Sequence, residues 1–241
     1  MIALFTDFGL NGPYVGQMHA VLASLAPAET IVDLQHDVPR HDARAAAYLL
    51  ASVLEPFPPG TVFLCVVDPG VGSPRRAMVV HAGEHWFVGP DNGLFEIVAR
   101  RAARCECREI LWRPAQLSST FHGRDLFAPV AASVALGTLP ESGPARLTVP
   151  ADRPWPDELA EVIYIDAFGN AATGLLAAGA GPGMILHAGG RPLTYADTFS
   201  AVPLGQPFWY RNSCGLVGIA VNGGSAAADL GVCAGDPVVM E

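Results

Sequence analysis

The feature that most constrains the fold is an alternation of short β-branched runs with helical patterns in the first half of the sequence. The expected strands lie at 2–5, 30–34, 61–67 and 77–81, and the expected helices at 14–25 and 42–54. The run at 61–67 is apolar throughout, as in a parallel strand buried on both faces. We therefore expect an α/β domain over residues 1–150, built around a central, mostly parallel sheet.

The second half follows a different pattern. Residues 138–156 hold five prolines and no convincing periodicity, which is typical of a linker or an extended connection at a domain boundary. Beyond it, short strand runs alternate with turn residues, and only 225–230 reads as a helix. We expect a smaller all-β, barrel-like domain over 157–241. Its expected strands lie at 161–165, 184–187, 207–211, 216–221 and 237–240.

Composition narrows the class of protein. With 51% hydrophobic and 15% charged residues, a disordered chain is excluded. The 14 basic residues against 23 acidic ones give a formal charge of -9, which argues against nucleic-acid and membrane partners. Five cysteines without a CxxC pair indicate neither a disulfide framework nor a zinc site. Because no leader or long apolar run is seen, we expect a cytoplasmic protein. We also expect no metal or other cofactor, since no metal-ligand spacing is present.

Two acidic residues follow predicted strands, where α/β sheets bind their ligands. Asp7 follows the first strand and either binds the hydroxyls of a ribose or caps the turn before Gly9. Asp68 follows the strand at 61–67 and meets a Pro-Gly turn, so an Asx-type turn is the alternative to a site carboxylate. Arg75, later in the same loop, is either solvent-facing or paired with that carboxylate.

A lone histidine and a polar turn complete the candidates of the first half. His122 precedes a helical run and is either structural or part of a site. The segment 89–93 is expected to open a helix. A metal cluster of Asp7, Asp68, Asp91 and His122 is conceivable, although no ligand spacing supports it.

Polar turns of the second half offer a further site. Asp166 and Asn170 either close a hairpin or clamp a zwitterion, with the carboxylate binding an ammonium group and the amide binding a carboxylate. The turn at 211–215, which contains Asn212 and Ser213, would add hydrogen-bond donors.

Six segments carry a resemblance that spans nearly the whole chain: TDFG with PYVGQM, VVDPGVGS, FVGPDNGLF, TFHGRDLFAPVAA, IDAFGN and NSCGLVGIAVNGGSAAADLGVCAGDPV. In this order they resemble the S-adenosyl-L-methionine (SAM) hydrolases that form adenosine. These enzymes are also called SAM hydroxide adenosyltransferases and are related to fluorinases and chlorinases. The resemblance implies an α/β domain, a β-barrel, and a homotrimer. Its active sites would lie between the N-terminal domain of one subunit and the C-terminal domain of its neighbour.

The resemblance also implies roles for particular residues. The water-activating trio matches Asp68, Arg75 and His122, and the carboxylate that binds ribose matches Asp7. The matches that would bind methionine are Asp166, Asn170 and Ser213, those near adenine are Phe199 and Gly223, and those lining the pocket are Tyr14 and Gly123. Halogenating relatives carry aromatic residues at the positions of Asp68 and His122, so the chain resembles the hydrolases. It differs from relatives at His41, where an aromatic residue is common, and at Cys214, where Arg or Ser is common.

The expected reaction is attack of water or hydroxide on C5′ of SAM, which releases adenosine and L-methionine. One alternative is a protein that binds SAM or adenosine without turnover. A second is a metal-dependent hydrolase that a chelator would inhibit. A third, a halogenase, is disfavoured because a carboxylate at position 68 would repel a halide.

Overall fold

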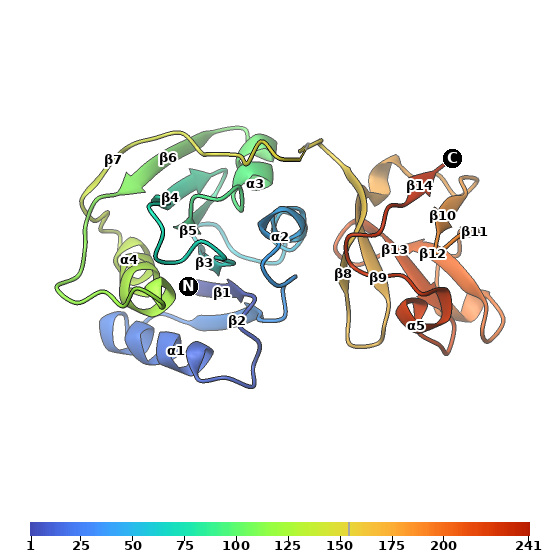
Figure 1. The fold of residues 1–241 in the computed structure, drawn as a ribbon, viewed down its shortest axis with the longest axis horizontal. Helices are drawn as coiled ribbons and strands as arrows, with labels where there is room; N and C mark the ends of the chain where they lie inside the picture. Colours follow the sequence, from blue (N-terminus) through green and yellow to red (C-terminus); the bar gives the residue numbers. More distant parts are fainter. Residues whose placement is uncertain (154) are drawn as a thin grey trace. The chain divides into compact units, whose positions relative to one another are not determined.

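The structure is a computed structural model that describes residues 1–153 and 155–241. The chain divides into two compact units (Figure 1). The first comprises Met1–Leu50 and Pro56–Arg153, and the second comprises Ala51–Glu55 and Pro154–Glu241. Within the described residues, the helices are all too short or too polar to cross a membrane.

The first unit is an α/β domain around a seven-stranded sheet with the order β2-β1-β3-β5-β4-β6-β7. Its strands are β1 (Ile2–Thr6), β2 (Ile31–Gln35), β3 (Val62–Val66), β4 (Ala77–Ala82), β5 (His85–Pro90), β6 (Cys105–Ile110) and β7 (Ser142–Pro144). Its helices are α1 (Tyr14–Leu25), α2 (Ala43–Leu50), α3 (Glu96–Arg101), a π-helical turn (Gly123–Phe127) and α4 (Ala128–Ala135).

The prediction of a mostly parallel sheet is confirmed. Strands β2, β1, β3 and β5 are parallel neighbours. Strand β4 is antiparallel to both β5 and β6, so β6 runs in the same direction as the parallel set. Only β4 and the short edge strand β7 run the other way.

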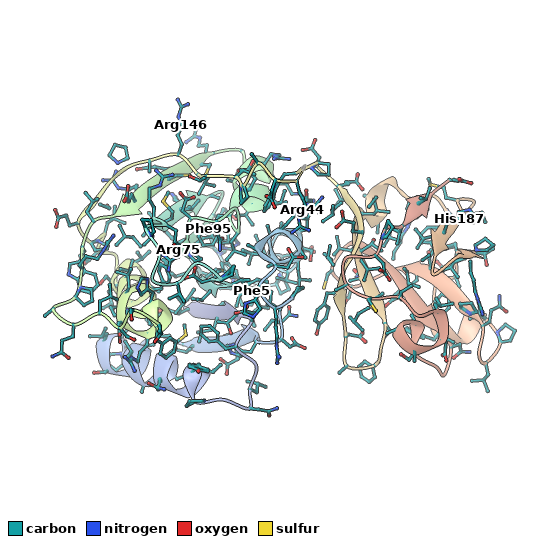
Figure 2. The ribbon with its side chains drawn as sticks, viewed as in Figure 1. Phe5, Arg44, Arg75, Phe95, Arg146 and His187 are labelled. Atoms are coloured by element: carbon teal, nitrogen blue, oxygen red, sulfur yellow. The ribbon has the colours of Figure 1, made fainter. Side chains whose placement is uncertain are left out.

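Helices cover both faces of this sheet. On one face, α1 and α4 pack over β1 and β3, with Met18, Leu22 and Phe127 fully buried. Successive strand residues point to opposite faces, so Phe5 and Phe63 lie on the other one. There Phe63 stacks on Phe87 with ring centroids 5.3 Å apart, and α2 and α3 lie side by side. Figure 2 shows Phe5 and Phe95 inside this unit. The burial of β1 and β3 on both faces explains their continuous apolar sequences.

Two local predictions are wrong, and two strands were missed. The helix expected over 42–54 ends at Leu50. The segment 89–93 does not open a helix, because Gly89 and Pro90 end β5 and α3 begins only at Glu96. The expected linker contains β7, whose prolyl end suits a sheet edge. Strand β6 was missed because its alternating charged residues lie near the sheet edge and hide the strand pattern.

The second unit consists mainly of two sheets, which confirms a strand-rich second domain. Its strands are β8 (Leu159–Ile165), β9 (Ala171–Leu176), β10 (Leu186–Ala188), β11 (Arg191–Leu193), β12 (Pro207–Arg211), β13 (Leu216–Val221) and β14 (Val239–Met240). The sheet orders are β12-β13-β9-β8 and β11-β10-β14. Strands β12 and β13 have the predicted bounds, whereas β9 and β11 were not predicted.

One short α-helix and two 3-10 turns connect these strands. Helix α5 (Ala226–Leu230) begins after Ser225, whose hydroxyl accepts from the Ala228 amide at 3.2 Å, and it ends at Gly231 with φ 66°. The 3-10 turns are Ala177–Gly179 and Phe199–Ala201.

Gly89 tests how tightly the first unit is packed. A Cβ at this position would clash with the carbonyl oxygen of Cys65 and approach the Phe95 ring to 2.9 Å. We expect Gly89→Ala to lower the free energy of unfolding in urea by about 1 to 3 kcal/mol, because neither neighbour has room to move. Gly16→Ala is the matched control, since a Cβ in α1 there meets nothing within 4 Å. The control is expected to be neutral or stabilising. Equal unfolding free energies for the wild type and Gly89→Ala would contradict this packing.

Candidate active site

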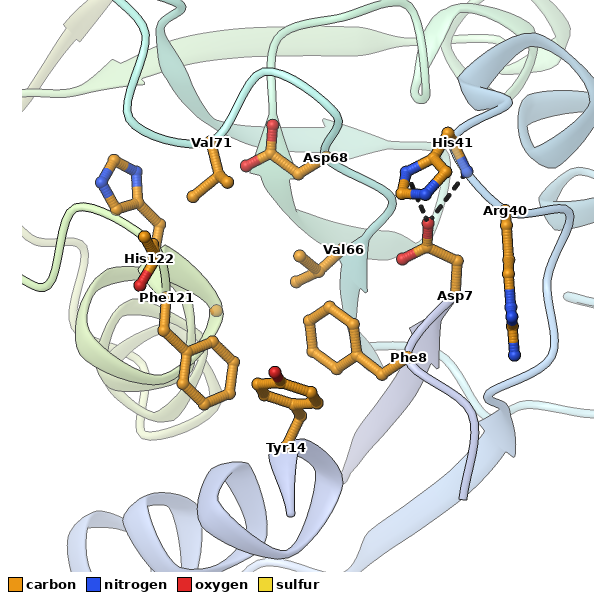
Figure 3. Close-up of a pocket in the computed structure, with 12 residues that line it drawn as sticks. Asp7, Phe8, Tyr14, Arg40, His41, Val66, Asp68, Val71, Phe121 and His122 are labelled. Carbon is orange, nitrogen blue, oxygen red and sulfur yellow. Dashed lines mark hydrogen bonds and ion pairs between the residues drawn. The ribbon is translucent and has the colours of Figure 1, made fainter. Parts of the chain in front are cut away.

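A cavity of about 370 Å³ opens where β1 and β3 end (Figure 3). We call it the strand-end pocket. Its position at the carboxyl ends of parallel strands is where α/β sheets bind ligands, and its volume suits a small molecule. The lining residues are Asp7, Phe8, Tyr14, Arg40, His41, Val66, Asp68, Val71, Thr120, Phe121, His122 and Gly123.

Asp68 and Arg75 form a buried ion pair at this pocket. The loop after β3 makes two successive turns, with Val71 N–H donating to the Asp68 carbonyl and Ser73 N–H to the Gly70 carbonyl. These turns bring Arg75 back against Asp68. The guanidinium binds both carboxylate oxygens, with Nε 2.7 Å from Oδ1 and Nη2 on Oδ2. Only 9% of the Arg75 side chain and 4% of the Asp68 side chain are exposed, so water screens the pair little.

His122 joins this pair from a different part of the chain. Its Nδ1 lies 3.0 Å from Nη2 of Arg75. Because a guanidinium can only donate, Nδ1 accepts this hydrogen bond and carries no proton. The neutral ring therefore holds its proton on Nε2, which leaves an N–H donor on a residue that lines the pocket.

Burial lowers the pKa of His122, and the charge of Arg75 lowers it further. The negative charges of Asp68 and Asp125 act in the opposite direction, and Arg113 adds to the lowering. Desolvation and a cationic neighbour both disfavour the imidazolium. The ring therefore remains neutral at pH 7, in agreement with an Nδ1 that accepts from Arg75.

A π-helical turn follows His122 directly and fixes the segment. Arg124 pairs with Asp125 through Nε at 2.6 Å and reaches the Gln17 amide oxygen in α1 at 2.7 Å. Asp125 also accepts from the Ser118 amide at 2.9 Å. The hydrogen bond from Arg124 is the main cause that lowers the pKa of Asp125. Such turns are frequent at functional sites. Here the turn is held to α1 through Gln17 and to the preceding loop through Ser118.

Asp91 and Asn92, in the segment after β5, hold the loops that form the pocket. Asn92 donates from Nδ2 to the carbonyl of Val67 at 2.8 Å and so holds the residue before Asp68. Asp91 is buried and accepts from Nε of Arg76 at 2.9 Å and from the Thr148 amide at 2.8 Å. Sequence reasoning marked this segment as polar but missed these supporting roles. The signal was an amide and a carboxylate beside a strand end.

Asp7 lies at the other side of the pocket, where β1 ends. Its side chain is 9% exposed, and Oδ2 accepts the backbone N–H of His41 at 3.0 Å. His41 has φ 59°, a left-handed conformation that turns its amide toward Asp7 (Figure 3). Its ring is 78% exposed, and Nδ1 is 4.0 Å from the same carboxylate oxygen. The Asp7 carboxylate thus lines the pocket and accepts from His41, whereas the Gly9 amide of the following turn donates to the His36 carbonyl.

Three aromatic rings form the wall that faces these carboxylates (Figure 3). Phe8, Tyr14 and Phe121 lie with ring centroids 5.2 to 5.8 Å apart. Gly123 lies against them, since a Cβ there would be 3.2 Å from Phe121 and 3.4 Å from Phe8. Sequence reasoning predicted Tyr14 and Gly123 by resemblance but missed Phe8 and Phe121. Phe8 directly follows Asp7, and Phe121 directly precedes His122.

In the second unit the structure brings Asp166 and Asn170 together. Oδ1 of Asp166 accepts from the amides of Phe168 and Asn170 at 2.9 Å, and Oδ2 accepts from Nδ2 of Asn170 at 2.9 Å. These bonds close the β8–β9 turn, so the hairpin interpretation holds. It does not exclude a ligand, because a carboxylate oxygen accepts more than one hydrogen bond.

The other predicted residues of this unit are spread over its four-stranded sheet. Asn212 closes the β12–β13 turn by accepting from the amides of Cys214 and Leu216 at 2.9 Å. Leu216 pairs with Leu176 and Ile219 with Ala171, so this turn, with Ser213, lies at the opposite end of the sheet from Asp166.

An aromatic cluster and a glycine complete the predicted set. Phe199 packs on Phe208 and Tyr210, with ring centroids 5.4 and 5.5 Å away. Burial raises the pKa of Tyr210, and the charges of Asp166 and Cys214 add to this. Gly223 follows β13 with φ 71°, at the same end of the sheet as Asp166.

The four-residue metal cluster considered above does not form. Asp91 is ion-paired with Arg76 and does not line the pocket. Across residues 1–153 and 155–241, no three His, Cys, Asp or Glu side chains are grouped so that they could hold a metal ion.

Comparison with known proteins identifies relatives over the full chain. Two family models match: the SAM hydroxide adenosyltransferase N-terminal domain over residues 2–143, and the corresponding C-terminal domain over residues 160–239. The (R)-S-adenosyl-L-methionine hydrolase of Thermus thermophilus is 44% identical and covers 98% of both chains. The hydrolase of the same name from Salinispora arenicola is 43% identical over 98% of this chain and 95% of its own. A fluorinase of Nocardia brasiliensis is 27% identical over 100% of this chain and 96% of its own.

Solved structures show the same fold. A protein of Thermotoga maritima described as uncharacterized and conserved superposes with a TM-score of 0.87 at 34% identity, covering 100% of this chain and 99% of its own. A conserved hypothetical protein of Thermus thermophilus gives a TM-score of 0.79 at 40% identity with the same coverage. Neither description names an activity.

The charge balance around His122 is testable by NMR titration of its imidazole. We expect a pKa below 6.5 in the wild type, with burial as the main cause and Arg75 as the second. Arg75→Gln is expected to raise this pKa, because it removes a cation and leaves the charge of Asp68 uncompensated.

Arg113→Gln is the matched control, and a smaller rise is expected because Arg113 acts more weakly on the ring. A wild-type pKa above 6.5, or a lower pKa in Arg75→Gln, would contradict the Arg75–His122 contact.

Proposed function

The chain belongs to the SAM hydroxide adenosyltransferase family, and we propose that it hydrolyses (R)-S-adenosyl-L-methionine to adenosine and L-methionine. The observation that carries this proposal is the bridge made by Arg75. One guanidinium binds Asp68 and His122, which come from separate loops, at the wall of one pocket. A carboxylate and an imidazole N–H held in this way are suited to orient one water molecule.

The reaction needs little more than a positioned nucleophile. The water oxygen forms a bond to C5′, the C5′–S bond breaks, and its electron pair goes to sulfur. Sulfur leaves as the neutral thioether of methionine, so no general acid is required. The water gives up one proton, which passes to the protein and then to solvent. Holding water in line with the C5′–S bond contributes up to about 7 to 11 kcal/mol, if the geometry is close to that of attack.

The bonding around Arg75 supports the following roles for the three residues. Each Asp68 oxygen retains a lone pair beyond its bond to Arg75, so Asp68 accepts the proton of the attacking water. His122 carries its proton on Nε2 and donates to the water oxygen as negative charge develops. Arg75 fixes both partners and offsets the carboxylate charge. In this proposal His122 orients and stabilises the nucleophile, and it is Asp68 that acts as the base.

The rest of the strand-end pocket suits the remainder of an adenosyl sulfonium. Asp7 is a nearly buried carboxylate at a strand end and would accept from the two ribose hydroxyls. Phe8, Tyr14 and Phe121 line the same pocket, and aromatic rings there would attract the cationic sulfur. The carboxylate of Asp68 disfavours the halogenase alternative, since a halide would be repelled at this wall.

The second unit would bind the two ends of the substrate. We propose that the methionine part lies along the four-stranded sheet, so that Asp166 and Asn170 bind it from one end and Asn212 and Ser213 from the other. We also propose that Phe199 and the backbone near Gly223 hold adenine. We further propose a homotrimer in which each strand-end pocket is completed by the second unit of a neighbouring subunit. The match of both family domains supports this assignment. No membrane or nucleic-acid partner is proposed, in keeping with the acidic composition.

Two finer expectations also remain proposals. Bridges between Glu161 and Pro237 and between Tyr195 and Trp209 connect the two sheets of the second unit at both edges, which supports a barrel-like closure. All five cysteines are free, as is typical of a reducing compartment, which supports a cytoplasmic location.

Replacing Asp68 tests the nucleophile. We expect Asp68→Ala to lower kcat for SAM by about 10² to 10⁴, because the proton acceptor is lost, while substrate affinity by calorimetry is largely retained. Asp152→Ala is the control, since this side chain is 72% exposed and lies in the linker. An Asp68→Ala enzyme within threefold of the wild-type rate would remove Asp68 from the mechanism.

Turnover in oxygen-18 water tests the bond that is cleaved. We expect mass spectrometry to find one heavy oxygen in adenosine and none in methionine, because the attacked atom is C5′. Unlabelled adenosine would contradict direct attack by water. Substrate that binds but stays intact for hours would instead support the binding-protein alternative, and inhibition by a chelator would support the metal-dependent one.

A further inference from the structure

We infer that His36 is a positioning residue, which holds the turn after β1 so that Asp7 and Phe8 face the pocket. His36 does not line the pocket, and its side chain is only 3% exposed. It is nevertheless hydrogen-bonded to the residue that precedes Asp7. This inference rests on the proposed function, because it concerns the turn that would bind the ribose.

A continuous line of hydrogen bonds runs from the end of β2 to this turn. Oδ1 of Asp33 lies 2.9 Å from Nε2 of His36, and Nδ1 of His36 lies 2.8 Å from the hydroxyl of Thr6. The Thr6 oxygen in turn lies 3.3 Å from the backbone nitrogen of Phe8. Thr6 is fully buried, so water cannot replace a lost partner.

The two ends of this line fix the direction of its first and last hydrogen bonds. The Phe8 amide can only donate, and the Asp33 carboxylate can only accept. The amide therefore donates to the Thr6 oxygen, and Nε2–H of His36 donates to Asp33. In the tautomer with its only proton on Nε2, Nδ1 accepts from the Thr6 hydroxyl. Asp33 retains capacity for a second donor, and Nε2 of His19 in α1 lies 2.6 Å from it.

Backbone contacts from the same segment hold the same turn. The carbonyl of His36 accepts from the Gly9 amide at 2.6 Å, and the Thr6 carbonyl accepts from the Val38 amide at 3.3 Å. Gly9 has φ 69°, which favours glycine at the point where the chain leaves the turn. His36 thus contacts both ends of the four-residue turn Thr6–Gly9, and Asp7 and Phe8 lie between these two contacts.

The line should influence substrate binding and not the chemical step. It ends at the backbone of the residue after Asp7, whereas Asp68, Arg75 and His122 lie on two other loops. Without the line, the Phe8 amide would be drawn toward another acceptor, and the Asp7 carboxylate would shift relative to the ribose. We therefore expect KM to rise while kcat changes little. A purely structural role would lower stability without this split.

Thr6 offers the cleanest test, because valine has the same shape without the hydroxyl. We expect Thr6→Val to raise KM for SAM about tenfold and to weaken adenosine binding by calorimetry to a similar degree, with kcat within about threefold. Thr6→Ser keeps the hydroxyl and should restore both constants. Thr61→Val is the matched control: Thr61 is also buried and loses a single bond, to the Pro58 carbonyl at 2.7 Å, at the opposite end of the sheet. It should lower Tm and leave KM unchanged.

A second pair of variants avoids the buried position if Thr6→Val does not fold. Asp33 is 46% exposed, and Asp33→Ala removes the acceptor that orients His36, so KM should rise severalfold. His19→Gln perturbs only the other contact of Asp33 and should leave KM unchanged.

The outcomes separate this inference from the proposed function. A wild type that neither hydrolyses SAM nor binds adenosine overturns the proposed function. An active wild type with equal KM in Thr6→Val, Thr6→Ser and Asp33→Ala overturns only the role of His36. The same conclusion follows if kcat falls and KM stays constant.

Discussion

The candidate site depends on the guanidinium of Arg75, which makes three contacts at once. Arg75 binds both oxygens of Asp68, donates to Nδ1 of His122, and packs over the ring of Phe127 with its central carbon 5.2 Å from the ring centroid. An arginine is suited to this because its planar group offers several donors in fixed directions. The contact decides which nitrogen of His122 carries the proton. It also keeps a carboxylate and an imidazole at fixed positions although they come from separate loops.

Several polar contacts outside the pocket hold the two loops that carry Asp68, Arg75 and His122. Asn92 holds the end of β3, Arg76 and Asp91 hold the loop that carries Arg75, and the π-helical turn holds the loop that carries His122. Each of these supports is a polar contact that is at least partly buried. Catalytic groups need positions fixed within a fraction of an ångström, and flexible loops do not provide this alone. Polar segments next to strand ends are therefore to be expected even where they touch no substrate.

The sequence predicted the α/β layout well because buried strands and amphipathic helices have distinct periods. Strands β1 and β3 were found from apolar runs with bounds that differ by one residue, and α1 was found from its spacing with the observed bounds. Strand β6 escaped because charged residues alternate along it near the sheet edge. The pairing of Arg75 with Asp68 was one of two alternatives that the sequence left open, because both residues lie in one loop. The joining of His122 to this pair was implied by resemblance alone, since spacing contains no information on which loops meet in space. Supporting contacts such as that of Asn92 with Val67 were missed because the sequence shows the polar side chain but not the backbone carbonyl that it binds.

The left-handed residue beside the pocket has a consequence for how this loop can vary. His41 meets Asp7 through its backbone amide, and most of its ring is in solvent. The requirement at this position is therefore for a dihedral angle and not for an imidazole. Asn and Gly adopt that angle at low cost, whereas Val, Ile and Thr do so poorly. Position 41 can therefore carry any residue that adopts a positive φ, whatever the chemistry of its side chain. An unusual residue at this position does not by itself indicate a different substrate.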